Sequence, residues 1–462
     1  MKNKSTHKVL KYSYLLLLLL CIQSCESLIE IDLPDDQINT EDIFKDIHTT
    51  QAALANLYTN VRQSSILAGD SNGLGVLLGY HTDELISLSQ ANSNADFDFY
   101  NNSLQASNQK ISAIWNTNYT HLYAINAFIE GLSNSKSIND QDKQLFLAEA
   151  HFLRALYYHY LTQIFGDIPY TTTTDYKVNT KISKTKSSEV LINVAQDLAY
   201  AIDILPTAYR NKERIYPNKA AAELLLAKNY LLQKQYDQAA FYALRILDNY
   251  PYSLEEDLQN VFKKSAKSTI WQLGLHASGN ATLEAFTYIF DIIPTNLYLS
   301  SAFTDDFSVN DTRMINWVRE VKQGDQNWYH AYKYKNTNAN NTDEYSIIFR
   351  IEEAYFILIE SLIYQNQMDK AIGYLNQIRQ RANLSPLPSN LTKAEAIQEM
   401  LEESKREFFC EHGHRFLDLK RNEQLHLLKN VKNNWQDKDI LFPIPEKEIL
   451  LNPKLLPQNN GY

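Results

Sequence analysis

The cluster Cys410-Glu411-His412-Gly413-His414 contains the residue types that bind transition metals, and it is the most direct candidate for chemistry in the sequence. Zinc takes thiolate and imidazole ligands, four in a structural site or three beside a water in a catalytic one. On a helix, Cys410 and His414 share one face while His412 points elsewhere. Two ligands do not close a tetrahedral site. We therefore interpret the cluster as a helix terminus, with Gly413 ending the helix and His414 in solvent, and predict no bound metal.

Other catalytic patterns also lack the spacing that their chemistry needs. The sequence has no Gly-Lys-Ser/Thr phosphate loop, no His-Glu-x-x-His zinc motif and no Gly-x-Ser-x-Gly nucleophile elbow. The adjacent carboxylates Glu352-Glu353 and Glu402-Glu403 diverge on a helix. A glycosidase needs two carboxyls that converge across a cleft, roughly 5–9.5 Å apart. We therefore predict a protein that is not an enzyme and uses no cofactor.

Aromatic residues within polar stretches give a stronger signal, and it points to binding. Residues 96–102 read Asp-Phe-Asp-Phe-Tyr-Asn-Asn, and residues 325–329 read Asp-Gln-Asn-Trp-Tyr. A sugar ring offers an apolar face for stacking and hydroxyls for amide and carboxylate partners, which suits this composition. The alternative is that these aromatics anchor the loops to the scaffold. Tyr332 and Tyr334 alternate with lysines as in a strand, which favours this structural role for them.

The elements that position these stretches are predicted to be helices. Residues 218–251 and 350–383 match at a constant offset of 132, and each reads as helix, turn and helix within the tetratricopeptide period. A degenerate third unit is expected near 142–205. Two long irregular loop insertions, 69–109 and 254–345, interrupt the scaffold, and loops of such length are usually functional. We predict a mostly α fold, a tetratricopeptide-like repeat scaffold with loop insertions, over residues 43–462.

The N-terminus has the features of an export signal. Four lysines precede a short apolar run that is too short to span a bilayer. Ile22-Gln23-Ser24-Cys25 follows, which resembles a bacterial lipobox and predicts a signal peptide at 1–24 with lipid on Cys25. Residues 25–42 are acidic and are expected to tether the body to the membrane through that lipid. Cys21 is the rival, but Leu20 before it is too large. An ordinary signal peptide with an incidental cysteine is the alternative.

The charge balance excludes one class of partner. The whole chain has a net charge of −10, and removal of the signal with its four lysines makes it more acidic still. Nucleic-acid binding requires clustered Lys and Arg to neutralise phosphates, so no nucleic-acid partner is expected.

Motifs in the C-terminal third resemble the SusD/RagB family. Residues 350–362 are similar to its Arg-x-x-Glu helix, and residues 405–421 to its Glu-Arg-x-x-Glu-aromatic block. The ending, from Phe442-Pro443-Ile444-Pro445 to Tyr462, is similar nearly residue for residue, as is the segment from Ala150 to Pro169. This chain departs from the pattern at Lys405, which replaces an acidic residue, and at His412, which is inserted before Gly413. Within the block we expect ion pairs from Arg406, Glu407, Glu411, Arg415, Asp418 and Arg421.

The resemblance implies a cell-surface outer-membrane lipoprotein that captures oligosaccharide. It also implies delivery of that ligand to a partner TonB-dependent transporter of the SusC type. Peptide capture and a protein-binding repeat scaffold remain as alternatives. Family motifs do not carry the ligand residues over to this chain, so the candidates are chosen by composition. They are Arg62, Tyr80, Asp83, Phe99, Tyr100, Asn101 and Trp328.

Overall fold

The computed structural model describes residues 40–89 and 95–462. The expected signal peptide, Cys25 and the tether up to residue 39 lie outside the described residues. Met1–Ile43 form a unit of their own, of which the structure describes the short helix α2 (Thr40–Ile43). The second unit runs from Phe44 to Tyr462. Within the described ranges, no helix combines the length and the apolar character that a membrane span needs.

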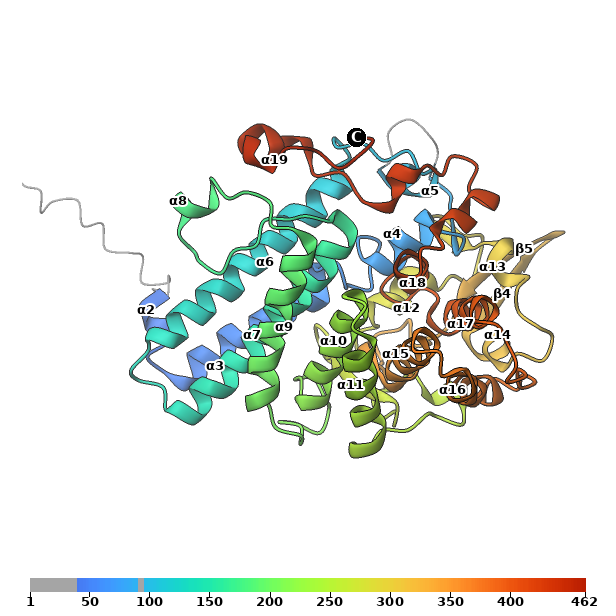
Figure 1. Ribbon diagram of the computed structural model, residues 1–462, viewed down its shortest axis with the longest axis horizontal. Coiled ribbons are helices and arrows are strands. Elements are labelled where there is room, and N and C mark those ends of the chain that lie inside the picture. The colour runs from blue at the N-terminus through green and yellow to red at the C-terminus, as the bar shows by residue number, and fades with distance from the viewer. Residues whose placement is uncertain (1–39, 90–94) are drawn as a thin grey trace, which may run out of the picture. The chain divides into compact units, whose positions relative to one another are not determined.

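The second unit is predominantly helical, as predicted (Figure 1). Polar caps start its longest helices: the Asn108 side chain accepts from the backbone N–H groups of Lys110 and Ile111, and Asn139 accepts from that of Asp142. The helices of eight or more residues are α3 (Ile47–Ser64), α4 (Leu74–His81), α6 (Gln109–Asn134), α7 (Asp140–Phe165), α9 (Ser187–Ile204), α10 (Lys219–Leu232), α11 (Tyr236–Asn249), α15 (Ile351–Tyr364), α16 (Met368–Arg381), α17 (Lys393–Phe408) and α18 (His414–Arg421).

Helix α7 lies in the core, between α6 and α9, and it also contacts α3 and α10. Nearly every residue from Phe146 to Phe165 is buried, because helices cover it on several sides. Gly166 ends it with a φ of +75°, a conformation that costs glycine little. Residues 142–205 thus form two packed helices joined by the 166–186 connection, which includes the single turn α8 (Tyr176–Asn179).

The internal repeat is visible in the turns as well as in the helices. Residues 218–251 form α10 and α11, and residues 350–383 form α15 and α16. Each turn contains one residue in the left-handed region, Lys234 with φ 57° and Asn366 with φ 60°, again 132 positions apart. The two units also touch, since the Tyr236 and Tyr364 rings stack at 4.5 Å and 2°. The repeated helical scaffold is therefore confirmed.

Short strands complete the body. One antiparallel sheet has the order β1-β3-β5-β4, formed by β1 (Leu85–Ser87), β3 (Leu297–Leu299), β5 (Gln326–Ala331) and β4 (Val318–Gln323). A second, fully buried pair joins β2 (Thr269–Leu273) to β6 (Ser346–Arg350), and β6 leads directly into α15.

The segments 69–109 and 254–345 are irregular only in part, which differs from the expectation of loop insertions. The first contains α4, β1 and α5 (Ala95–Tyr100), and every side chain of α4 is buried. The second contains β2 to β5 together with α12 (Leu283–Tyr288), α13 (Ser301–Thr304) and α14 (Thr312–Trp317). These elements are too short for hydrophobic periodicity to identify, and β1 and β2 pair with partners far along the chain, although β4 and β5 form a hairpin.

Candidate ligand-binding surface

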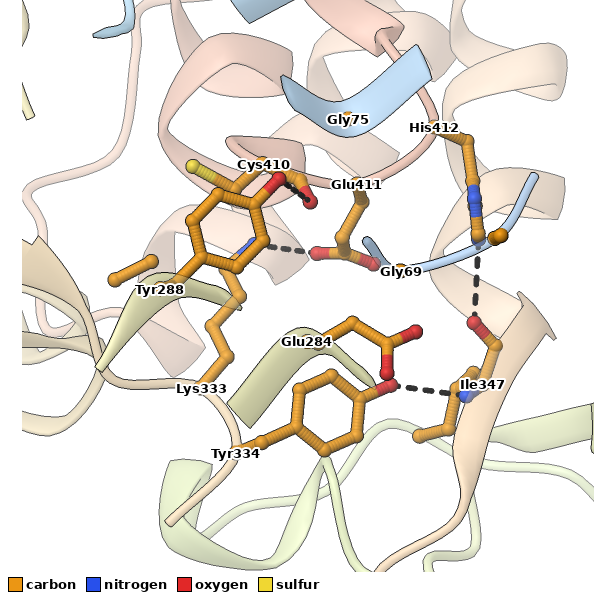
Figure 2. A pocket seen from close by; sticks show the side chains of 12 residues that line it. Gly69, Gly75, Glu284, Tyr288, Lys333, Tyr334, Ile347, Cys410, Glu411 and His412 are labelled. Carbon is orange, nitrogen blue, oxygen red and sulfur yellow. Dashed lines mark hydrogen bonds and ion pairs between the residues drawn. The ribbon is translucent and has the colours of Figure 1, made fainter. Parts of the chain in front are cut away.

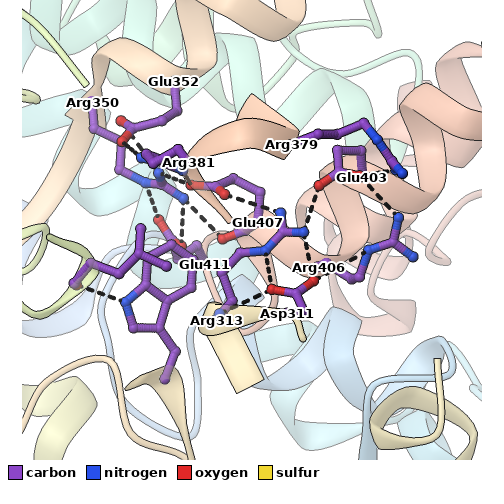
Figure 3. Close-up of polar contacts among 12 residues, drawn as sticks. Asp311, Arg313, Arg350, Glu352, Arg379, Arg381, Glu403, Arg406, Glu407 and Glu411 are labelled. Carbon is purple, nitrogen blue, oxygen red and sulfur yellow. Dashed lines mark hydrogen bonds and ion pairs between the residues drawn. The ribbon is translucent and has the colours of Figure 1, made fainter. Parts of the chain in front are cut away.

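A buried network of charges holds the C-terminal helices to the second insertion (Figure 3). The fully buried Arg313 guanidinium contacts Asp311 at 2.8 Å, Glu403 at 2.5 Å and Glu407 at 3.3 Å. Glu407 Oε1 also accepts from Arg350 and Arg381, both at 2.6 Å. Because each charge has several partners, the pairing compensates the cost of removing them from water. The arrangement holds several elements together through ion pairs between them.

The predicted ion pairs of residues 406–421 are confirmed, but they are mostly buried between elements. Arg415 donates to both carboxylate oxygens of Asp83 at 3.1 Å, and Arg421 contacts Glu360 at 2.6 Å. Lys405, where the family pattern has an acidic residue, lies 3.1 Å from Asp83. The departure from the pattern therefore places a second cation on the same carboxylate.

A small cavity lies beside this network and is too small for a sugar (Figure 2). Its volume of about 30 Å³ suits a single water molecule. The Tyr288 hydroxyl faces the Cys410 carbonyl at 3.4 Å, and the Tyr334 hydroxyl accepts from the Ile347 N–H at 2.9 Å. Lys333 pairs with Glu411 on the opposite wall. Tyr334 lies beyond the strand expected to hold it, since β5 ends at Ala331. The predicted structural role of Tyr334 is nevertheless confirmed, because its side chain is buried.

The Cys410–His414 cluster lies at this cavity and at the start of α18. Burial raises the pKa of the Cys410 thiol and lowers that of His412 to about 4. The prediction of a solvated His414 was wrong: its ring stacks on Phe408 at 4.3 Å, and its side chain is 13 % exposed. The prediction that Gly413 ends a helix was also wrong: α17 ends at Phe408, before the cluster, and Gly413 is the left-handed N-cap residue of α18. Among the described residues, no three His, Cys, Asp or Glu side chains group to hold a metal ion.

Three of the sequence-selected candidates are buried and present no surface to a ligand. Phe99 is fully buried and packs edge-on against Phe442 at 5.3 Å. Tyr80 is 2 % exposed, on the buried helix α4. Asp83 is 8 % exposed, and Arg415 and Lys405 hold its pKa well below the usual range against the effect of burial. For Phe99 the structural alternative holds, and composition alone does not distinguish buried side chains such as Tyr80 and Asp83 from exposed ones.

Arg62 lies apart from the other candidates. It is at the end of α3, where its Nη1 donates to the Gly274 carbonyl at 2.9 Å. A hollow of about 200 Å³ lies next to it, lined by neighbours such as Gln63, Asp70 and Lys110 but by no aromatic side chain. A larger hollow of about 520 Å³, between the end of α7 and the C-terminal segment, also has no aromatic lining. Neither offers a ring for stacking.

Tyr100 and Asn101 are half-buried, and the fold brings three distant residues to them. Asn434 donates to the Asn101 side-chain carbonyl at 2.8 Å, from 333 positions away. The Lys432 ammonium lies 4.3 Å from the centre of the Tyr100 ring. Tyr298, half-buried on β3, has its pKa raised by burial and by the nearby Tyr100 phenol. We call Tyr100, Asn101, Tyr298, Lys432 and Asn434 the tyrosine surface.

The four-stranded sheet extends this surface toward Trp328. Leu299 on β3 lies opposite Tyr329 on β5. Successive side chains of a strand alternate between faces, so the neighbours Tyr298 and Trp328 share the other face. Trp328 is half-buried there, opposite Val321. By the same alternation Arg319, two residues before Val321, lies on this face as well. Rings, amides and cations therefore meet on one side of the sheet, the combination that binds polyhydroxylated ligands.

Lys432 gives the surface its charge. Its ammonium donates to the Tyr80 carbonyl at 2.7 Å, near the end of α4. Burial lowers the pKa of Lys432 to about 8, although the Asp83 carboxylate acts in the opposite direction. The group is therefore still mostly charged at neutral pH.

Sequence reasoning selected Tyr100, Asn101 and Trp328 but missed Tyr298, Lys432 and Asn434. The only local signal was an Asn-, Lys- and Trp-containing stretch, 429–435, which resembles the composition used for the other candidates. Nothing in the sequence shows that this stretch meets residue 101.

Comparison with known proteins shows which families this chain is similar to. A model described as starch-binding, associating with the outer membrane, matches residues 32–231, and the SusD family model matches residues 319–462. SusD-like protein P2 of Formosa agariphila is 28 % identical, with 97 % of this chain and 98 % of that protein covered.

Solved structures show the same fold. A SusD superfamily protein from Bacteroides vulgatus superposes with a TM-score of 0.79 at 21 % identity, covering 91 % of this chain and all of that one. A laminarin-binding SusD-like protein has a TM-score of 0.76 at 20 % identity, with 91 % and 100 % covered. The helical scaffold is thus that of SusD-like proteins. The chain belongs to the SusD/RagB family.

Proposed function

We propose that this protein captures oligosaccharides at the cell surface and passes them to a SusC-like TonB-dependent transporter, without catalysis. The observation that supports this most directly is the tyrosine surface with Trp328: aromatic rings beside amides and a cation, on one side of a small sheet. Stacking against sugar faces and hydrogen bonds to hydroxyls need no reactive group. Membership of a glycan-binding family and the laminarin-binding relative of the same fold give further support.

The location is part of the proposal. Lipid on Cys25 would hold the protein on the outer membrane, and the acidic segment after it would act as the tether. A partner transporter is expected because a binding protein outside the membrane has no route inward by itself.

Titration calorimetry against a glycan panel tests the binding step. We expect at least one glycan to bind with micromolar or weaker affinity and to be recovered unchanged after incubation. The double substitution Tyr100→Ala and Trp328→Ala should weaken binding at least tenfold. Tyr123→Ala is the matched control, because Tyr123 is a 54 % exposed aromatic on α6, outside the surface. Binding of peptides but of no glycan would contradict the proposal, as would release of a cleaved product.

Transfer to a transporter needs a separate measurement. Purification of the tagged protein from its own outer membrane should retain a TonB-dependent transporter. Its absence from that complex, with ligand binding intact, would leave capture standing and refute delivery.

A further inference from the structure

The Lys432 ammonium lies in the tyrosine surface without a carboxylate of its own. Its recorded partners are the Tyr80 carbonyl at 2.7 Å and the Tyr100 ring at 4.3 Å. An ammonium has three N–H donors, and these contacts engage only part of that capacity. Lys429, three residues earlier, differs from it, because it pairs with Asp437 at 2.9 Å.

The acidic group that acts on Lys432 is already neutralised by others. Asp83 raises the pKa of Lys432 against the effect of burial. Both Asp83 oxygens, however, accept from Arg415 at 3.1 Å, and Lys405 lies 3.1 Å away. Two cations therefore share that carboxylate before Lys432 is counted. The positive charge at the surface is left partly uncompensated and partly desolvated.

Neutral groups surround this charge on the side where a ligand would arrive. Asn101 and the exposed Asn434 are amides, and Tyr100 and Tyr298 are phenols. Buried His81, below Lys432, has its pKa lowered to about 4 and is neutral at pH 7. A partly desolvated cation among neutral hydrogen-bonding groups is best satisfied by an anion, since charge-assisted hydrogen bonds are the stronger kind.

We propose that the ligand of the tyrosine surface is an acidic saccharide, whose carboxylate or sulfate group binds the Lys432 ammonium while Tyr100 and Tyr298 contact the sugar rings. This rests on the proposed function and names its ligand class. The net charge of −10 repels anions at long range, so an acidic ligand has to be held locally, by the Lys432 ammonium.

A purely structural role for Lys432 makes different predictions. Its bond to Tyr80 is of the type in which a lysine caps the last carbonyls of a helix, here α4. A cap affects stability and leaves the choice between neutral and acidic ligands unchanged.

An array of neutral, carboxylated and sulfated oligosaccharides, probed with the full protein, tests the proposal. We expect the strongest binders to be acidic, with at least tenfold weaker binding of the matched methyl-esterified or desulfated compound. The carboxylated and sulfated arms distinguish the two sources of the anion. Affinity for the best acidic binder should fall with rising salt concentration.

Three variants test whether the preference for acidic oligosaccharides depends on Lys432. Lys432→Gln should reduce affinity for the acidic binder at least tenfold and largely remove its salt dependence. Lys432→Arg should retain both, and Lys429→Gln should leave both unchanged. Melting temperature, measured for each variant, identifies any loss that comes from unfolding, and the arginine variant preserves the test if the glutamine variant is unstable.

The outcomes separate this inference from the function on which it rests. Preferred binding of neutral glycans, or equal affinities for Lys432→Gln and Lys429→Gln, overturns the acidic ligand and leaves glycan capture standing. Failure of every glycan to bind overturns the proposed function itself.

Discussion

Replacement of Asp83 by asparagine should destabilise the protein without weakening its ligand binding. Asp83 is 8 % exposed and is contacted by two cations, Arg415 and Lys405. Removing one partner of a buried ion pair leaves the other charge uncompensated, at a cost of about 3–5 kcal/mol. Asparagine is nearly isosteric and its carbonyl still accepts one hydrogen bond. We therefore expect the free energy of unfolding to fall by about 3 kcal/mol, the lower end of this range.

Urea denaturation at pH 7 measures this loss, with Asp437→Asn as the matched control. Asp437 also pairs with a lysine, but its side chain is 85 % exposed, so its removal should cost no more than about 0.5 kcal/mol. The unfolding entropy of a chain this long makes 1 kcal/mol correspond to about 1 °C, so the melting temperature should fall by about 3 °C. Glycan affinity, measured below the transition at pH 6, should match that of the unmodified protein, because Lys432 stays charged there even without the Asp83 carboxylate that raises its pKa.

Equal stability of Asp83→Asn and Asp437→Asn would refute the assignment of Asp83 to the structural network. A selective loss of ligand affinity at unchanged stability would instead restore it as a ligand residue. The dependence of stability on pH at acidic pH gives a second check. The folded-state pKa of Asp83 is depressed, so its contribution is complete above the unfolded pKa of about 4 and is lost as the pH falls further.

Three further predictions follow from particular residues. Cys25→Ala should release the protein from the membrane fraction in cell fractionation, and retention there would contradict lipidation at this residue. Lys234→Gly should leave stability unchanged or raise it by up to about 1 kcal/mol, because glycine adopts a φ of 57° without strain, whereas Lys234→Val should lower it. Burial lowers the pKa of His412 to about 4, so the unfolded chain takes up a proton there first as the pH falls below about 6.5. Stability should then drop by about 2 kcal/mol between pH 7 and pH 5 from this residue, and His412→Gln should flatten the measured profile by that amount.

The helical scaffold was predictable because its signals are local. Each repeat is specified by residues within its own helix pair, so the two sequences can be aligned directly, at an offset of 132. The left-handed residues Lys234 and Asn366 are separated by the same offset. The ion pairs of residues 406–421 were partly predictable for the same reason, since spacing of three or four places charges on adjacent turns. Their burial was not, because it depends on partners such as Asp83 and Glu360 far along the chain.

The ligand candidates were predictable only where composition and exposure coincide. Phe99 and Tyr100 are neighbours with the same aromatic character, yet one is fully buried and the other is half-buried at the surface. The direction in which each side chain points is set by the helix α5 and its packing on Phe442, which no local pattern reveals. Lys432 and Asn434 reach the same place through tertiary packing alone.

The hydrogen bond between Asn434 and Asn101 joins positions 333 residues apart, and this separation has a consequence for biogenesis. A chain that is synthesised and folds from its N-terminus presents Tyr100 long before Lys432 exists beside it. Truncated or half-translated chains therefore have an incomplete recognition surface, however well their helices form. If the tyrosine surface binds the ligand as proposed, truncation before residue 432 should abolish binding, because Lys432 and Asn434 are then missing from it.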